Sequence, residues 1–188
     1  LDGEGLEQVR RLVLEPTLQA LKARGIDYRG VIYAGLMLTD AGPQVIEFNC
    51  RFGDPECQTL MPLLGPELAQ VLQACALGRL DLAPALSIDA RCSACVVAAA
   101  SGYPDAPRKG DAIQLGFSSE TNRQLFHAGT RRSADGELIT SGGRVLAVVA
   151  QGDNFDQAFA AAYNGLQQVQ FDGITYRRDI GHQVRSSG

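Results

Sequence analysis

The sequence has no apolar run near the roughly 20 residues that a membrane-spanning helix requires. Its net charge is −4 and its isoelectric point is about 5.2, which argues against a general binder of nucleic-acid backbones. Residues 1–4 are acidic and lack the basic and apolar order of a signal peptide. An initiator methionine is also missing, so we expect that the chain begins inside a longer protein. These features predict a protein with no membrane and no nucleic-acid partner.

Patterns typical of zinc sites and disulfide frameworks are also scarce. His127 and His182 stand alone, and no second Cys-x-x-Cys pair accompanies Cys92 and Cys95. That pair runs into residues 96–100, which read as a buried strand on which positions three apart face opposite sides. The five cysteines are an odd number and lie in apolar segments, which favours free thiols in a reducing compartment. We therefore expect structural cysteines and a cytoplasmic protein.

At 188 residues, the chain is long enough for one large domain or two small ones. Its first part opens on a helix-period pattern that Pro16 should kink or split. Residues 30–38 and 44–50 read as two strands of a hairpin. A further helix is bounded by Pro66 and Gly78. The first part is thus expected to combine helices with a strand pair.

The segment 80–90 has no clear period and is the best candidate for a domain boundary. One helix is expected beyond it, with Asn154 as its N-cap. The remainder reads as a mostly β module with strands at 94–100, 112–117, 124–128 and 144–150. Together the two parts predict the α+β class.

One strand carries the residues that matter for chemistry. Residues two apart on a strand share a face, so Glu47, Asn49 and Arg51 should line one side. Carboxylate and amide oxygens suit Mg²⁺ or Mn²⁺, and a guanidinium suits a phosphate or carboxylate. Asp54 and Pro55 then look like the start of a helix, with Asp54 as N-cap. The opposite face of the strand would be apolar, lined by Ile46, Phe48 and Cys50.

A plainer interpretation is an edge strand whose polar face meets water, and three residues alone would favour it. The longer run of twelve residues, 45–56, argues against this edge-strand interpretation. Residues 47–56 closely resemble the signature of the glycinamide ribonucleotide synthetase (phosphoribosylamine–glycine ligase) family of ATP-grasp enzymes. The resemblance continues, in the family's order, in residues 30–37, 101–104, 126–130, 141–146 and 178–181.

This resemblance implies a reaction in which ATP phosphorylates the carboxylate of glycine and 5-phosphoribosylamine attacks the acyl phosphate. The products would be glycinamide ribonucleotide, ADP and phosphate, formed in purine biosynthesis. Glu47 and Asn49 match the family's metal ligands for Mg²⁺ or Mn²⁺, with Arg51 beside the nucleotide phosphates. Arg51 matches the cation that stabilises the transferred phosphoryl group, and Asp54 is a second candidate catalytic residue, with helix capping as its alternative.

The resemblance also implies an architecture. Residues 1–86 would be the C-terminal part of an ATP-grasp domain, and residues 87–188 a mostly β C-terminal domain. Many ATP-grasp enzymes carry a second metal-binding carboxylate where this chain has Gly35, and the glycine agrees with this family. Family members place an amine-substrate domain and a nucleotide-covering lobe ahead of this region. The chain has only two lysines, Lys22 and Lys109, and neither lies on a strand pattern suited to ATP. We therefore expect it to be inactive without the N-terminal half of the enzyme.

Two alternatives stay open at this point. The chain could be a non-catalytic binding domain derived from the same fold, although such a domain should have lost some of the metal-face residues. His127 and residues 142–144 could close over a substrate, or could simply be a strand end, a hairpin and a surface ion pair formed by Arg144.

Overall fold

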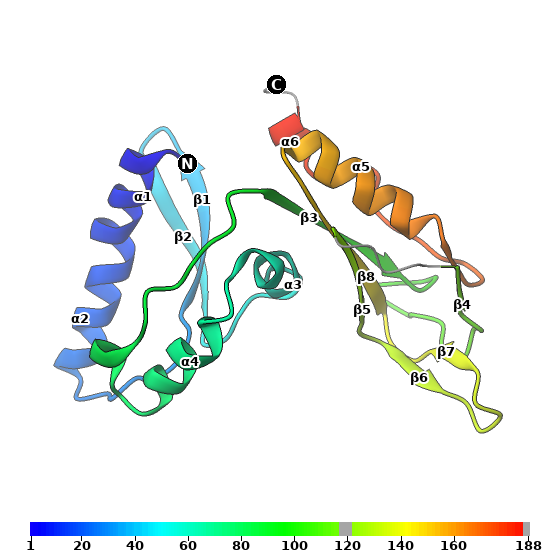
Figure 1. Ribbon diagram of the computed structural model, residues 1–188, viewed down its shortest axis with the longest axis horizontal. Helices are drawn as coiled ribbons and strands as arrows, with labels where there is room; N and C mark the ends of the chain where they lie inside the picture. The colour runs from blue at the N-terminus through cyan, green and yellow to red at the C-terminus, as the bar shows by residue number, and fades with distance from the viewer. Residues whose placement is uncertain (117–121, 186–188) are drawn as a thin grey trace. The chain divides into compact units, whose positions relative to one another are not determined.

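The computed structural model describes residues 1–116 and 122–185, and the chain divides into two compact units (Figure 1). The first unit comprises Leu1–Gly53 and Pro66–Ser87. The second comprises Asp54–Gly65 and Ile88–Gly188. No helix within the described ranges combines the length and apolarity needed to cross a bilayer.

Helical turns open the first unit as α1 (Gly3–Val9), a π-helical segment η1 (Arg10–Leu14) and α2 (Glu15–Ala23). Asp2 caps this helix by accepting a hydrogen bond of 2.9 Å from the backbone N–H of Gly5. The π-helical turns directly precede Pro16. Proline has no backbone N–H to donate to the preceding turn, and its ring crowds the carbonyl groups there. The irregularity expected at Pro16 is therefore present as a widened turn.

The predicted hairpin is confirmed as β1 (Tyr33–Thr39) paired antiparallel with β2 (Gly42–Asn49). A β-bulge shifts the register between Gly35 and Leu36. The predicted helix after it is α4 (Leu68–Ala76), followed by a short 3₁₀ turn, η3 (Leu80–Leu82). Val9 and Val13 are the buried apolar residues of the opening helix.

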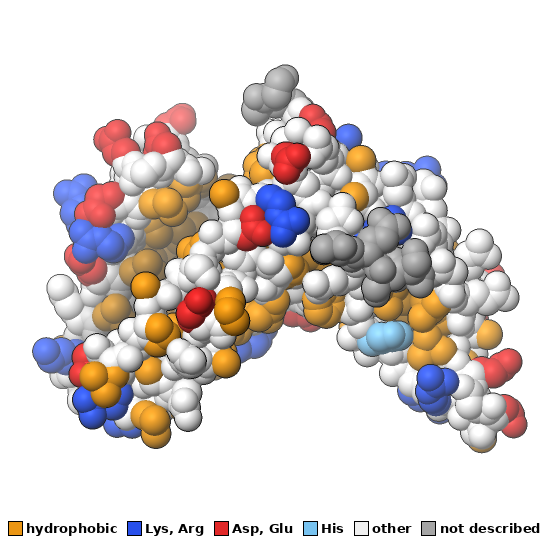
Figure 2. Space-filling view, in the orientation of Figure 1, with side chains coloured by type: hydrophobic (Ala, Val, Ile, Leu, Met, Phe, Trp, Pro, Cys, Tyr) orange, Lys and Arg blue, Asp and Glu red, His pale blue; other side chains and the backbone are white. Residues whose placement is uncertain are grey.

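The apolar face expected on β2 exists in the sequence but is not buried. The side chains of Ile46 and Phe48 are 63% and 47% exposed. Figure 2 shows hydrophobic side chains gathered over this hairpin. Within this chain, the strand that carries the polar candidate residues is accessible on both faces.

The second unit is built on an antiparallel sheet in the order β3-β8-β5, formed by Cys92–Ala99, Arg144–Gly152 and Arg123–His127. Helix α5 (Phe155–Leu166) lies along this sheet (Figure 1). Asn154 is its N-cap, as predicted, and accepts a hydrogen bond of 2.9 Å from the backbone N–H of Gln157. The core lies between helix and sheet and includes Val96, Ala98, Val148, Ala162 and Leu166.

Short elements complete the second unit. Two further strand pairs are β4 with β9 (Gln114–Leu115 and Val169–Gln170) and β6 with β7 (Thr130–Arg132 and Leu138–Thr140). The expected strand at 112–117 is reduced to β4, and Phe117 lies outside the described residues. The remaining short helices are α3, η2 and α6, at Glu56–Leu60, Met61–Leu63 and His182–Arg185.

Candidate active site

Glu47 and Asn49 lie two positions apart at the end of β2, and their side chains meet. Asn49 Nδ2 donates a hydrogen bond of 2.9 Å to Glu47 Oε1. The prediction that these two side chains share a face is therefore confirmed. Glu47 is exposed and Asn49 is half-buried, so both remain accessible to an ion or ligand.

Arg51 does not continue that face as a strand residue, contrary to the expectation. β2 ends at Asn49, and Arg51 lies in the bend that follows. Its Nη1 donates a hydrogen bond of 2.8 Å to the backbone oxygen of Phe52. The guanidinium is exposed and has five N–H donors, so this bond leaves most of its donor capacity for a ligand.

The expectation that Asp54 caps a helix is wrong. Helix α3 begins at Glu56 with Pro55 as the preceding cap residue, because the backbone of Pro55 (φ −98°, ψ 17°) is outside the helical region. The carboxylate of Asp54 is held by two side chains instead. Gln58 Nε2 donates to Oδ1 at 3.0 Å, and Arg144 Nη2 lies 3.0 Å from Oδ2.

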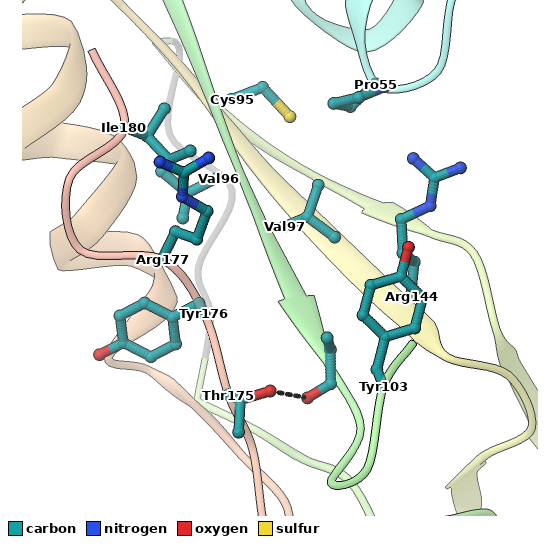
Figure 3. Close-up of a pocket in the computed structure, with 11 residues that line it drawn as sticks. Pro55, Cys95, Val96, Val97, Tyr103, Arg144, Thr175, Tyr176, Arg177 and Ile180 are labelled. Carbon is teal, nitrogen blue, oxygen red and sulfur yellow. Dashed lines mark hydrogen bonds between the residues drawn. The ribbon is translucent and has the colours of Figure 1, made fainter. Parts of the chain in front are cut away.

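A cavity of about 420 Å³ opens in the second unit beside Asp54 and β3 (Figure 3). Its walls are mostly apolar, with two arginines at the rim, and include Pro55, Val97, Tyr103, Arg144, Arg177 and Ile180. Several of these residues belong to the segments that resemble the ligase family. The sequence could not show that these distant segments meet.

The two cysteines of the Cys-x-x-Cys pair are separated as predicted. Cys92 packs against the hydrophobic core, whereas Cys95 lines the cavity, and both are free thiols. Burial raises the pKa of the Cys95 thiol to about 11. A smaller opposing effect on that pKa comes from a hydrogen bond with Thr59. Cys95 is therefore a neutral thiol at ordinary pH.

His127 and Arg144 take the structural positions that the plainer interpretation expected, but the hairpin expected at the glycines is wrong: residues 142–143 connect β7 to β8, which belong to different sheets. His127 ends β5, and its Nδ1 lies 3.0 Å from Thr130 Oγ1. Gly143 packs against the ring of Tyr103, since a Cβ at position 143 would lie 2.4 Å from Tyr103 Cδ2. Arg144 forms an ion pair, as that interpretation predicted, and its partner is Asp54.

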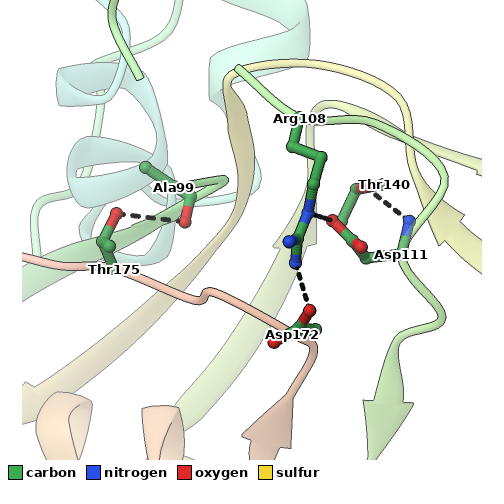
Figure 4. Close-up of polar contacts among 6 residues, drawn as sticks. All are labelled: Ala99, Arg108, Asp111, Thr140, Asp172 and Thr175. Carbon is green, nitrogen blue, oxygen red and sulfur yellow. Dashed lines mark hydrogen bonds and ion pairs between the residues drawn. The ribbon is translucent and has the colours of Figure 1, made fainter. Parts of the chain in front are cut away.

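Another polar group, not anticipated from the sequence, fixes the loop that carries Tyr103. Arg108 bridges Asp111 and Asp172, with nitrogen–oxygen distances of 2.9 and 2.6 Å (Figure 4). Thr140 Oγ1 accepts a hydrogen bond of 3.1 Å from the backbone N–H of Asp111. Because these contacts join separate segments of the unit, we assign them a structural role.

Among the described residues, no three His, Cys, Asp or Glu side chains cluster as they would in a metal site made by protein alone. Glu47 and Asn49 supply hard oxygen ligands, which suit Mg²⁺ or Mn²⁺ when substrate phosphates complete the coordination. The donor set fits a shared nucleotide–metal site and does not fit a closed structural one.

Two family models match the chain in order. The ATP-grasp (A) domain of phosphoribosylglycinamide synthetase matches residues 2–57, and the C domain of the same enzyme matches residues 93–183. The chain is 48% identical over 181 residues to a phosphoribosylamine–glycine ligase of Synechocystis sp., covering 95% of the chain and 43% of that protein. It is 46% identical to the ligase of Corynebacterium ammoniagenes, covering 96% of the chain and 42% of that protein. The chain thus spans less than half the length of these curated relatives.

Solved structures give the same assignment. The crystal structure of phosphoribosylamine–glycine ligase from Thermotoga maritima matches with a TM-score of 0.83 and 35% identity, covering 95% of this chain and 44% of that one. A biotin carboxylase from Campylobacter jejuni matches with a TM-score of 0.61 at 14% identity, which is a likeness of fold alone. Both neighbours have the ATP-grasp fold, and the mixture of helices and strands is α+β, as predicted. By these matches along nearly its whole length, the chain belongs to the phosphoribosylglycinamide synthetase family.

Proposed function

We propose that the chain is the C-terminal portion of an ATP-dependent ligase that joins glycine to 5-phosphoribosylamine. The complete enzyme would form glycyl phosphate from ATP and glycine and then glycinamide ribonucleotide, ADP and phosphate. The observation that carries the proposal is the contact between Glu47 and Asn49 on β2, inside the region that matches the ATP-grasp domain. Residues 1–86 would belong to that domain and residues 87–188 to the C-terminal domain. Free cysteines accord with the cytoplasm as its location.

Glu47 and Asn49 are the residues we assign to Mg²⁺ or Mn²⁺. The support is chemical: both offer side-chain oxygens, and the 2.9 Å hydrogen bond from Asn49 Nδ2 to Glu47 Oε1 keeps the two side chains next to each other. When bound, the ion would neutralise charge on the nucleotide phosphates. Binding an ion through both side-chain oxygens would require the Asn49 amide to turn its oxygen toward Glu47.

Arg51 and Asp54 are the residues we assign to the reacting groups. The exposed guanidinium of Arg51 can donate to phosphoryl oxygens as negative charge develops on them. The side chain of Asp54 is 51% exposed although both of its oxygens have protein partners, so it can still contact a polar substrate. Each carboxylate oxygen can accept more than one hydrogen bond.

We further propose that the isolated chain has no ligase activity. The relatives are more than twice as long, and the groups that bind ATP's base and the amine substrate would lie in the remaining part. Holding the reactants in line is worth on the order of 7–11 kcal/mol. Losing half of that slows turnover roughly 10³-fold or more.

The test is a hybrid ligase. In it, this chain replaces the part of the Synechocystis protein that aligns with it over 181 residues. We expect ADP release that requires both glycine and 5-phosphoribosylamine. Glu47→Gln should abolish most of it, because the change removes the negative charge of the one carboxylate that we assign to the ion. Glu137→Gln, an equivalent change in the other unit, is the control.

A hybrid that unfolds cooperatively yet shows no substrate-dependent ADP release would contradict the proposal and favour a non-catalytic binding domain. Turnover that Glu47→Gln leaves unchanged across a magnesium titration would refute the metal assignment alone. The isolated chain is assayed beside the hybrid. Robust turnover by the chain alone would show that it contains a nucleotide site of its own.

A further inference from the structure

A single guanidinium holds both the backbone and the side chain of Asp54. Arg144 Nη1 donates a hydrogen bond of 2.9 Å to the backbone oxygen of Asp54, and Arg144 Nη2 lies 3.0 Å from Oδ2 of the same residue. The two residues are 90 positions apart in the sequence but lie in the same unit. We propose that Arg144 is a positioning residue that fixes the Asp54 carboxylate for catalysis. This inference rests on the proposed function, because it takes Asp54 to act on the reacting groups.

The geometry needs an arginine in particular. A guanidinium is planar and presents two N–H groups in fixed directions, whereas an ammonium is a point charge. Here one nitrogen fixes the position of the Asp54 backbone and the other fixes the rotation of its carboxylate. Gln58 holds the remaining oxygen at 3.0 Å, so both carboxylate oxygens are restrained.

Arg144 is itself fixed by its backbone. It pairs with Ala99 across β3 and β8, and its carbonyl accepts a hydrogen bond of 2.8 Å from the N–H of Gly129. The preceding Gly143 packs on the ring of Tyr103. In Figure 3, the hydroxyl end of Tyr103 points toward the Arg144 side chain. The backbone of Arg144 is therefore held by hydrogen bonds at the start of β8, and its guanidinium reaches Asp54 from there.

A plain surface ion pair would have a different effect. Such pairs contribute little to stability and are weakened by salt. The chain offers a matched example in Arg185 and Asp156, which also lie 3.0 Å apart and whose arginine is also 40% exposed. Within the part of the chain that the structure describes, Arg185 Nε contacts one carboxylate oxygen of Asp156, and Arg185 makes no hydrogen bond to the backbone of that residue. It is the control for loss of an exposed pair.

The experiment uses the hybrid ligase with Arg144→Ala, Arg144→Lys, Asp54→Ala and the double variant Asp54→Ala/Arg144→Ala. We expect Arg144→Ala to lower kcat roughly 10- to 100-fold, since small misplacement of a reacting group costs up to about 10²-fold. The KM for ATP should stay within about twofold, because no contact to nucleotide is lost. Arg144→Lys should recover only part of the rate. In the Asp54→Ala background, Arg144→Ala should have no further effect.

The outcomes distinguish a failure of the positioning role of Arg144 from a failure of the proposed ligase function. If Asp54→Ala lowers kcat while Arg144→Ala does not, or if the two losses are additive, the positioning role is wrong and the ligase assignment survives. If Asp54→Ala is silent, the catalytic assignment of Asp54 and this inference fail together. Arg185→Ala should leave kcat unchanged. If it lowered kcat as much as Arg144→Ala does, the effect of Arg144→Ala would be explained by the loss of surface charge, and the positioning role would be wrong. Should Arg144→Ala not fold, Arg144→Lys decides, and full kcat in that variant overturns the proposal.

Discussion

Gly35 lies directly opposite Glu47 in the β1–β2 hairpin, and a Cβ at position 35 would lie 3.1 Å from Glu47 Cγ. The missing side chain leaves room for the Glu47 carboxylate to lie over β1. The register shift that follows Gly35 also bends the hairpin at this point. The glycine therefore shapes the polar face on which Glu47 and Asn49 meet.

Replacing Gly35 by alanine should disturb the metal site more than the fold. The added methyl meets the flexible stem of Glu47, which must move by a few tenths of an ångström. We expect the Mg²⁺ concentration for half-maximal turnover of the hybrid ligase to rise several-fold. The free energy of unfolding should change by less than about 1 kcal/mol, because alanine is otherwise favoured over glycine in a strand. A magnesium titration and a denaturant titration measure the two quantities.

Gly3→Ala is the control, because a Cβ at that position would meet no atom within 4 Å apart from its chain neighbours and the backbone of its own helix. It should leave the magnesium dependence unchanged. An unchanged magnesium dependence in Gly35→Ala as well would show that the Glu47 orientation is unimportant for the ion.

Asn154→Ala should destabilise the second unit by about 1 kcal/mol, the usual cost of losing an N-cap. Its side chain accepts the hydrogen bond from Gln157 N–H that begins α5, and α5 covers the core of this unit. Denaturant unfolding followed by circular dichroism measures the loss. Asn164→Ala makes the same change at an exposed position inside α5 and should not destabilise, since alanine is the better helix former. Equal effects of the two changes would contradict the capping role.

Cys95 should resist alkylation at pH 7–8, while the exposed Cys50 reacts readily. Burial raises the pKa of Cys95 to about 11 from the ordinary 9.0, so only a very small fraction is thiolate at neutral pH. Its alkylation rate should keep rising as the pH passes 9 and level off only near 11. Mass spectrometry of iodoacetamide-treated protein measures both sites in one sample.

The raised pKa of Cys95 also predicts how the free energy of unfolding changes with pH. The unfolded thiol ionises near pH 9 and the folded one near 11, so the contribution of Cys95 is complete below pH 9. It is lost as the pH rises from 9 toward 11. Cys95→Ala should therefore show a smaller loss of stability over that interval than the unsubstituted chain, and equal losses would argue against the shift.

Elements with a local signature could be predicted from the sequence. The hairpin, α4 and the Asn154 cap follow from turn residues, helical spacing and a polar cap, all of which act within a few residues. Strands β6, β7 and β9 were missed because two or three residues are too few to show alternation. The sequence also placed Glu47 and Asn49 on one face, because strand geometry fixes that relation.

The surroundings of Asp54 could not be predicted. Its spacing before Pro55 and Glu56 resembled a helix cap, but the backbone of Pro55 delays the helix by one position. The partner that holds its carboxylate, Arg144, is 90 residues away, and the packing of α3 against β3 together with the pairing of β3 and β8 brings the two close. Local pattern carries no information about such a contact.

Arg51→Ala in the hybrid ligase should lower kcat roughly 10²- to 10³-fold, the usual cost of removing one donor that stabilises developing charge. The KM for ATP should change much less, because a contact that strengthens in the transition state contributes little to ground-state binding. Arg51→Lys should recover only part of the loss, since lysine keeps the charge without the two-pronged geometry. Arg24→Ala, an exposed arginine at the end of α2, is the control and should leave kcat unchanged. Steady-state ADP release at saturating glycine and 5-phosphoribosylamine gives both constants. A variant whose KM rises while kcat holds would make Arg51 a ground-state binding residue, and its assignment to the transferred phosphoryl group would then be wrong.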